Sequence, residues 1–180
     1  MLGVKRALLT LIRVYVGFQW LESGWEKLHN PVWVGEKAGT AINGFFNAAI
    51  AKATGEHPAV QSWYAWFLKN VAQPSAGFFT YLIPIGEFLV GLALVAGALT
   101  TFAAIMGAFM NLNFMLAGTT STNPILYTLQ ILIIAGGAAA GYYGLDYFLL
   151  PYIRPYWNRI RQAFRLSSSD LGVASAKEAR

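Results

Sequence analysis

The chain has 180 residues, of which 56% are apolar and only 12% charged, and its mean hydropathy is +0.47, a balance typical of a membrane protein rather than of a soluble domain. It contains no cysteine, which excludes disulfides, cysteine-ligated zinc, iron–sulfur clusters and covalently attached c-type haem. Much of the net charge of +5 lies beside the last apolar stretch, where basic residues set topology or meet anionic lipid, so we expect no nucleic-acid partner.

The first apolar stretch runs from residue 7 to residue 28 and follows Lys5 and Arg6. A basic start of this kind also opens a signal peptide. Here, however, Arg13 and Glu22 interrupt the stretch, and no small-x-small cleavage pattern follows before Trp25. We therefore predict a helix that is retained as the first membrane span.

Residues 30–75 break the hydropathy and are punctuated by glycine and proline. Two sets of apolar side chains nevertheless recur there at helical spacing, within 42–53 and 60–71. The aromatic residues around Trp63 and Trp66 favour the headgroup level of a bilayer. We predict two short amphipathic helices in the segment 30–75, which cap the bundle or lie in the membrane interface.

Three further apolar stretches follow, over residues 76–99, 102–117 and 125–143. Small residues at 136–141 would let helices approach closely. With the first stretch, these give four spans. We therefore predict an all-α fold, an integral membrane four-helix bundle.

The last part of the chain differs in composition from the apolar stretches. Residues 147–165 combine aromatic and arginine side chains, which is typical of a cytoplasmic interfacial segment. Residues 166–180 are polar and have the composition of a disordered cytoplasmic tail. The transmembrane domain is accordingly expected to comprise residues 1–165.

Orientation follows from the basic residues that flank the spans. Lys5, Arg6 and four arginines after the last span share one side if the number of spans is even, against four lysines on the other side. The positive-inside rule places the richer side in the cytoplasm. We predict a multi-pass protein of the cell membrane with both termini cytoplasmic and residues 30–75 facing outward.

Polar side chains inside the spans need partners, because a charge at the bilayer centre costs about 2.5–3.5 kcal/mol on insertion scales. At about 1.5 Å per residue, Glu22, both asparagines of the third span and Gln130 form one layer in the outer half. Glu87 lies deeper, and Arg13 is within reach of it. Such groups often only fasten helices together. The six side chains are Arg13, Glu22, Glu87, Asn111, Asn113 and Gln130.

One of these side chains, Glu22, is suited to more than fastening helices together. Glu22 stands between Trp20 and Trp25, and a carboxylate in apolar surroundings suits proton exchange. The two histidines, His29 and His57, both lie in the outward part of the chain and not deep in a span, so we expect neither haem nor another metal site. No phosphate-binding or dinucleotide motif occurs.

These residues coincide with the pattern of a known family. The chain resembles the DoxX family of small four-helix membrane proteins, in the branch of the DoxD-type subunit of thiosulfate:quinone oxidoreductase. The most specific piece is Met-Asn-Leu-Asn-Phe at 110–114. The matching stretches are 13–28 (RVYVGFQWLESGWEKL), 55–66 (GEHPAVQSWYAW), 86–94 (GEFLVGLAL), 109–124 (FMNLNFMLAGTTSTNP) and 144–151 (GLDYFLLP).

The resemblance implies a quinone-linked role in sulfur oxidation at the outer face, in which thiosulfate becomes tetrathionate and electrons pass to quinone. It also implies a small second subunit or a redox-enzyme partner. On this reading a small sulfur anion binds at Trp25, Lys27 and His29. The expected quinone-binding residues are Trp20, Asn111, Asn113 and Gln130, and the expected catalytic residues are Arg13, Glu22 and Glu87.

Two other classes of function stay open at this point. A non-catalytic membrane anchor or scaffold for a redox or detoxifying enzyme would explain why no prosthetic-group motif is present. A small-solute carrier could use the same polar layer, although four spans without a broken-helix pair are not typical of one. Whether the chain forms a homo-oligomer is likewise open.

Overall fold

The computed structural model of the chain describes residues 2–149, 151–152 and 155. These residues form helices and connecting turns without any strand, which confirms the all-α expectation for this part of the chain. The four arginines expected after the last span and the expected tail at 166–180 lie outside the described residues, as does most of the segment 147–165.

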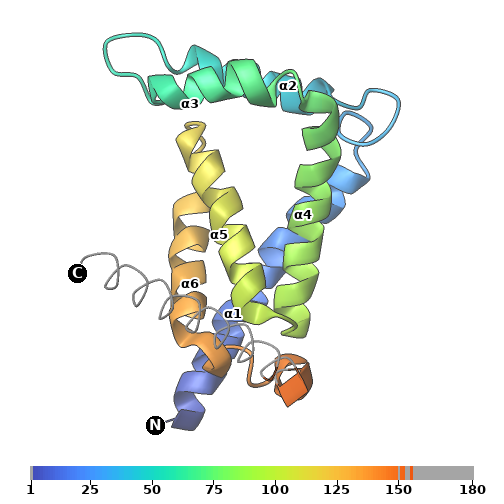
Figure 1. Cartoon of the computed structure of the whole chain (residues 1–180), viewed down its shortest axis with the longest axis vertical. Coiled ribbons are helices and arrows are strands. Elements are labelled where there is room, and N and C mark those ends of the chain that lie inside the picture. The colour runs from blue at the N-terminus through green and yellow to red at the C-terminus, as the bar shows by residue number, and fades with distance from the viewer. Residues whose placement is uncertain (1, 150, 153–154, 156–180) are drawn as a thin grey trace, which may run out of the picture.

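Four long helices run along the molecule, and shorter helices lie across one end (Figure 1). The N-terminus of the first long helix lies at the opposite end (Figure 1). The long helices are α1 (Leu2–Leu28), α4 (Ala76–Ala96), α5 (Thr100–Leu116) and α6 (Asn123–Gly136). The crossing helices, which we call the cap, are α2 (Thr40–Ala51) and α3 (Ser62–Phe67), the latter continued by the π-helical turn η1 (Leu68–Ala72).

Length and composition single out one membrane span among the described residues, the 21-residue α4. The other apolar helices, Thr100–Leu116 and Asn123–Ala139, are shorter. α1 has 27 residues, but charged side chains occur near both of its ends and at Arg13.

The last apolar stretch does not continue as a helix to residue 143. α6 ends at Gly136, and Gly137 adopts a φ of 52°, which is favourable for glycine alone among common residues. A single 3₁₀ turn, η2 (Gly137–Ala139), follows. The small residues that predicted close helix packing therefore also end the helix.

α1 and α4 pack backbone to backbone. A Cβ atom placed on Gly91 of α4 would collide with the backbone nitrogen of Leu21, and one placed on Gly24 of α1 would collide with that of Phe88. Small residues at such positions allow close contact between helices where the hydrophobic effect contributes little. The backbones of α1 and α4 therefore lie in close contact along this stretch.

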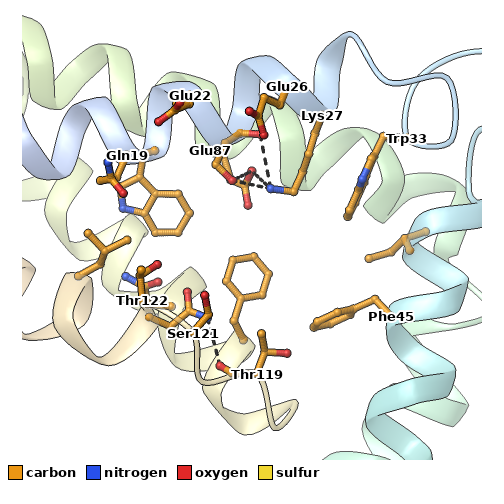
Figure 2. Close-up of a pocket in the computed structure, with 17 residues that line it drawn as sticks. Gln19, Glu22, Glu26, Lys27, Trp33, Phe45, Glu87, Thr119, Ser121 and Thr122 are labelled. Atoms are coloured by element: carbon orange, nitrogen blue, oxygen red, sulfur yellow. Dashed lines mark hydrogen bonds and ion pairs between the residues drawn. The ribbon is translucent and has the colours of Figure 1, made fainter.

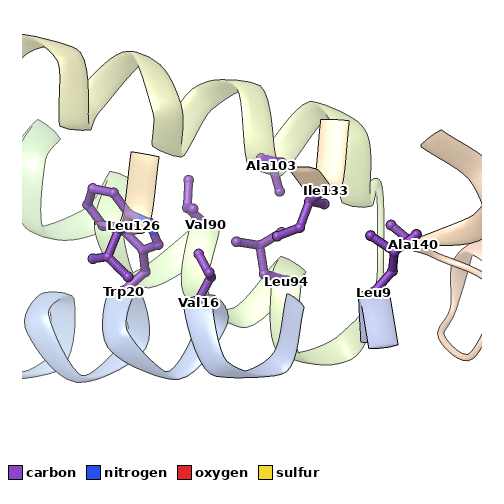
Figure 3. Packing of buried hydrophobic residues seen from close by; sticks show 10 residues of the cluster. Leu9, Val16, Trp20, Val90, Leu94, Ala103, Leu126, Ile133 and Ala140 are labelled. Carbon is purple, nitrogen blue, oxygen red and sulfur yellow. The ribbon is translucent and has the colours of Figure 1, made fainter. Parts of the chain in front are cut away.

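Two apolar clusters fill the interior. The first lies between the four long helices and includes Val16, Trp20, Val90 and Leu94 (Figure 3). The second lies beneath the cap, where Phe46 of α2 and other apolar side chains pack against the neighbouring ends of α4 and α5. The cap is therefore part of the folded unit.

A polar contact closes the end of the molecule opposite the cap. The Asp146 carboxylate accepts hydrogen bonds from the backbone N–H groups of Leu99 (2.6 Å) and Thr100 (2.9 Å), where α5 begins. It thereby satisfies amides that a helix N-terminus leaves without partners. The buried Arg13 also lies at this end, where it donates to the carbonyl oxygen of Tyr143 at 3.1 Å.

We expect Asp146→Ala to lower the free energy of unfolding by about 1–2 kcal/mol, the usual cost of losing a helix N-cap. The melting temperature of the detergent-purified protein measures this loss. Asp146→Asn keeps one side-chain oxygen for these amides and should lose less. An unchanged melting temperature for Asp146→Ala would show that this contact does not hold the start of α5.

Candidate functional site

A cavity of about 380 Å³ lies between the cap and the neighbouring ends of the long helices. Its wall on the α1 and α4 side carries Lys27 and Glu87, and its opposite wall carries Thr119, Ser121 and Thr122 (Figure 2). Trp33 and Phe45 close it on the cap side (Figure 2). Its other lining residues are Gln19, Trp20, Glu22, Ser23, Glu26, Ile42, Asn111, Phe114, Asn123 and Leu126.

The most distinctive group in this cavity is an ion pair whose carboxylate is buried. Lys27 Nζ lies 2.7 Å from a carboxylate oxygen of Glu87, and the Glu87 side chain is only 2% exposed. Ser23 Oγ donates to the same carboxylate at 3.1 Å and accepts from Lys27 Nζ at 2.5 Å. Ser23 and Lys27 are four residues apart on α1, so both face α4. The three side chains form one network across the α1–α4 contact.

This network corrects the expected Arg13–Glu87 pair. Glu87 faces the cap end and bonds Lys27, whereas Arg13 points to the far end of the bundle and bonds Tyr143. A Cβ atom on Gly97 or Gly144 would collide with the Arg13 guanidinium, so these two glycines make the space that it fills. The depth of each residue along its helix could not predict these two contacts, because depth does not give the direction in which a long side chain points.

Aromatic rings and amides form the deep part of the cavity. The ring of Trp20 stacks on Phe114 with centroids 6.4 Å apart, and Phe45 meets Phe114 edge to face at 6.1 Å. Asn111 Nδ2, also in the lining, donates to Gln130 Oε1 at 2.7 Å, and both amides are fully buried. A flat ring with polar substituents matches this combination of surfaces.

Other expected site residues lie away from the cavity. Trp25 is 55% exposed on α1, and its carbonyl oxygen accepts from His29 Nδ1 at 2.9 Å, with the two rings 4.1 Å apart. Asn113 donates to the carbonyl oxygen of Phe109 and accepts from Tyr64. Of the expected sulfur-anion residues, the cavity includes Lys27 alone.

The cavity thus gathers five of the expected residues: Trp20, Glu22, Lys27, Glu87 and Asn111. Gln130 adjoins it through Asn111. Sequence reasoning missed Ser23, Trp33 and Phe45. For Ser23 there was a usable signal, its spacing of four residues from Lys27, whereas nothing in the sequence indicated how the cap would fold over the cavity.

The charge of the lining bears on what the cavity can hold. It includes three carboxylates, Glu22, Glu26 and Glu87, but a single ammonium group, that of Lys27. An excess of negative charge repels a dianion. An uncharged ring that takes up protons fits this lining better.

The cap and the segment that precedes it are fastened to the helices beneath them. Thr80 Oγ1 of α4 donates to the Trp33 carbonyl oxygen at 2.6 Å and accepts from the Gly39 amide at 3.1 Å. Tyr64 of α3 donates to the backbone oxygen and to Oδ1 of Asn113, both at 3.1 Å. These contacts attach the cap side of the cavity to α4 and to α5.

Burial raises the pKa of Tyr64 to about 12, above its usual value of about 10. The folded state therefore favours the neutral hydroxyl, and the stability that this gives is complete below pH 10 and is lost as the pH rises toward 12. We expect the melting temperature to fall over this range, and Tyr64→Phe to reduce that fall. Near pH 8 the variant should lose about 1 kcal/mol with the hydrogen bond. Equal alkaline profiles for both proteins would contradict this role of Tyr64.

Comparison with known proteins identifies one family. The family model DoxX matches residues 8–120, a range that includes α2 to α5, most of α1 and most of the cavity lining. No curated protein and no solved structure matches the chain.

Proposed function

The chain belongs to the DoxX family of membrane proteins, and we propose that it is the membrane subunit of a quinone-linked oxidoreductase of the DoxD-like branch. The observation that carries this proposal is the cavity beneath the cap, whose lining combines an ion pair with a buried carboxylate, stacked aromatic rings and a buried amide. Aromatic walls hold a ring, and the ion pair offers a site for protons.

In this proposal α1, α4, α5 and α6 are the four membrane spans. Both termini are cytoplasmic, and the cap lies at the outer surface of the cell membrane. This orientation rests on the basic residues that flank the spans, together with the exposed Trp63 and Trp66 on α3. Tryptophan is enriched at the headgroup level, where the cap would lie.

The quinone ring enters the cavity and lies between the aromatic side chains and the Lys27–Glu87 pair. Two electrons and two protons reduce it to the quinol, and oxidation of two thiosulfate ions to one tetrathionate supplies the two electrons. Glu87 passes protons to the ring, and the exposed Glu22 of the cavity lining exchanges protons with the surroundings. Because the lining is acidic, thiosulfate reacts at the outer surface and not inside the cavity.

Thiosulfate-dependent reduction of a short-chain quinone by the detergent-purified chain tests the proposal. Turnover followed optically, with a quinone-free control, would support a catalytic role for this chain. If the folded, quinone-supplemented protein is inactive, alone and after addition of a co-purifying small subunit, the catalytic proposal fails. A stoichiometric redox-enzyme partner in a pull-down would then favour the non-catalytic anchor.

A further inference from the structure

Three polar atoms deep in the bundle have no hydrogen-bond partner among the described residues: Trp20 Nε1, Asn111 Oδ1 and Gln130 Nε2. Their residues are 3%, 0% and 0% exposed. Buried polar groups are satisfied in the large majority of cases, so unsatisfied ones call for an explanation. Trp20 and Asn111 line the cavity, and Gln130 adjoins it through Asn111, so the three atoms together indicate a missing polar partner at its edge.

These atoms come together around Gly107 of α5. A Cβ atom on this glycine would lie 3.1 Å from Trp20 Nε1 and would collide with Gln130 Nε2, so the two donors flank the same position. Asn111 follows Gly107 by four residues and therefore lies on the same face of α5. Trp20 and Asn111 also line the cavity, which connects this polar cluster to the space where a ligand would lie.

The cluster offers two donors and one acceptor. In their mutual hydrogen bond Asn111 uses its NH₂ group and Gln130 uses its carbonyl oxygen. The NH₂ group of Gln130 and the carbonyl oxygen of Asn111 remain without a partner. The inventory stays the same if both amides are turned over, so it does not depend on how the oxygen and nitrogen atoms are assigned. Trp20 adds a donor only.

A hydroxyl group is complementary to this inventory, because its oxygen accepts from N–H groups while its hydrogen is donated to a carbonyl oxygen. A quinone carbonyl can only accept and would leave the amide oxygen without a partner. The cluster therefore distinguishes the reduced ring from the oxidised ring, which otherwise have nearly the same shape.

We propose that Trp20, Asn111 and Gln130 form a hydroxyl site that binds the quinol more tightly than the quinone. This inference rests on the proposed function and deepens it, since it assigns a redox-state preference to the same cavity. One additional satisfied hydrogen bond corresponds to about tenfold in affinity. Tenfold tighter binding of the quinol would raise the two-electron midpoint potential of the bound couple by about 30 mV. A water molecule is the other source of a hydroxyl group here.

Calorimetric titration of the detergent-purified chain with three probes tests the site: a short-chain quinone, its quinol kept reduced under anaerobic conditions, and the dimethyl ether of that quinol. We expect the quinol to bind about tenfold more tightly than either of the others. The ether keeps the ring and its acceptors but has no hydroxyl hydrogen, so it separates the effect of the hydroxyl from that of the ring.

The double variant Asn111→Leu with Gln130→Met removes both amides together and leaves neither unpaired. It should bind all three probes with similar affinity. Thr128→Val, which alters an exposed hydroxyl on α6, the helix of Gln130, should keep the preference for the quinol. Equal binding of quinol, quinone and ether by the unmodified chain would mean that water occupies the site, and would overturn the inference but not the function. If none of the probes binds, the proposed function fails as well.

Discussion

Glu87→Gln is expected to reduce quinone turnover by roughly a hundredfold or more, the usual range for loss of a group that transfers protons in the rate-limiting step. Glutamine has the same shape and can still hydrogen-bond Ser23, but it cannot release or take up a proton. Because Glu87 forms the ion pair with Lys27 at 2.7 Å inside the cavity, its replacement acts directly where the ring is proposed to lie. Initial rates at saturating quinone measure the effect.

Two controls separate proton transfer from folding. Glu56→Gln changes an exposed carboxylate in the connection between α2 and α3 and should leave the rate unchanged. The double variant Lys27→Met with Glu87→Met removes both charges, so no unpaired buried charge remains and folding should be largely preserved. It should nevertheless be inactive. Normal turnover in either Glu87 variant would contradict the proton role.

Gly91→Ala is expected to destabilise the fold by about 3 kcal/mol, at the upper end of the range for overpacking. The added Cβ atom would meet the backbone nitrogen of Leu21, and a backbone atom cannot move aside by changing a rotamer. α1 and α4 would have to separate, which would also disturb the Lys27–Glu87 pair between them. The melting temperature should fall by roughly 6–12 °C.

Gly77→Ala is the matched control on the same helix. A Cβ atom at Gly77 meets nothing within 4 Å among the described residues, and alanine has the higher helix propensity by about 1 kcal/mol. This variant should be as stable as the unmodified chain or slightly more so. Equal melting temperatures for Gly91→Ala and Gly77→Ala would mean that α1 and α4 do not need their close contact.

The architecture was largely predictable because it follows from hydropathy and helical periodicity. The segment at 30–75 illustrates this, since apolar spacing placed helices there in spite of its glycines and prolines. The end of α6 could not be predicted, because the small residues at 136–141 suit a helix-packing surface equally well. Only the φ of Gly137 shows that the helix ends there.

The candidate site was predictable in residue type but not in pairing. A membrane interior makes each polar residue conspicuous, so Glu87, Asn111 and Gln130 stood out in the sequence. Which of them meet depends on the rotation of each helix about its axis. Asn113 is an example of a pairing that the sequence did not indicate. It is two residues from Asn111 and therefore lies on another face of α5, where it accepts a hydrogen bond from Tyr64 of the cap.

Photolabelling with a short-chain azidoquinone tests the central claim most directly, because it asks whether quinone occupies the cavity beneath the cap. Labelled peptides identified by mass spectrometry should come from residues 19–27 of α1 and 111–123 of α5 and its following turn, and an excess of unlabelled quinone should suppress them. Labelling confined to the lipid-facing side chains of α4, or labelling that excess quinone does not reduce, would contradict a quinone site in this cavity.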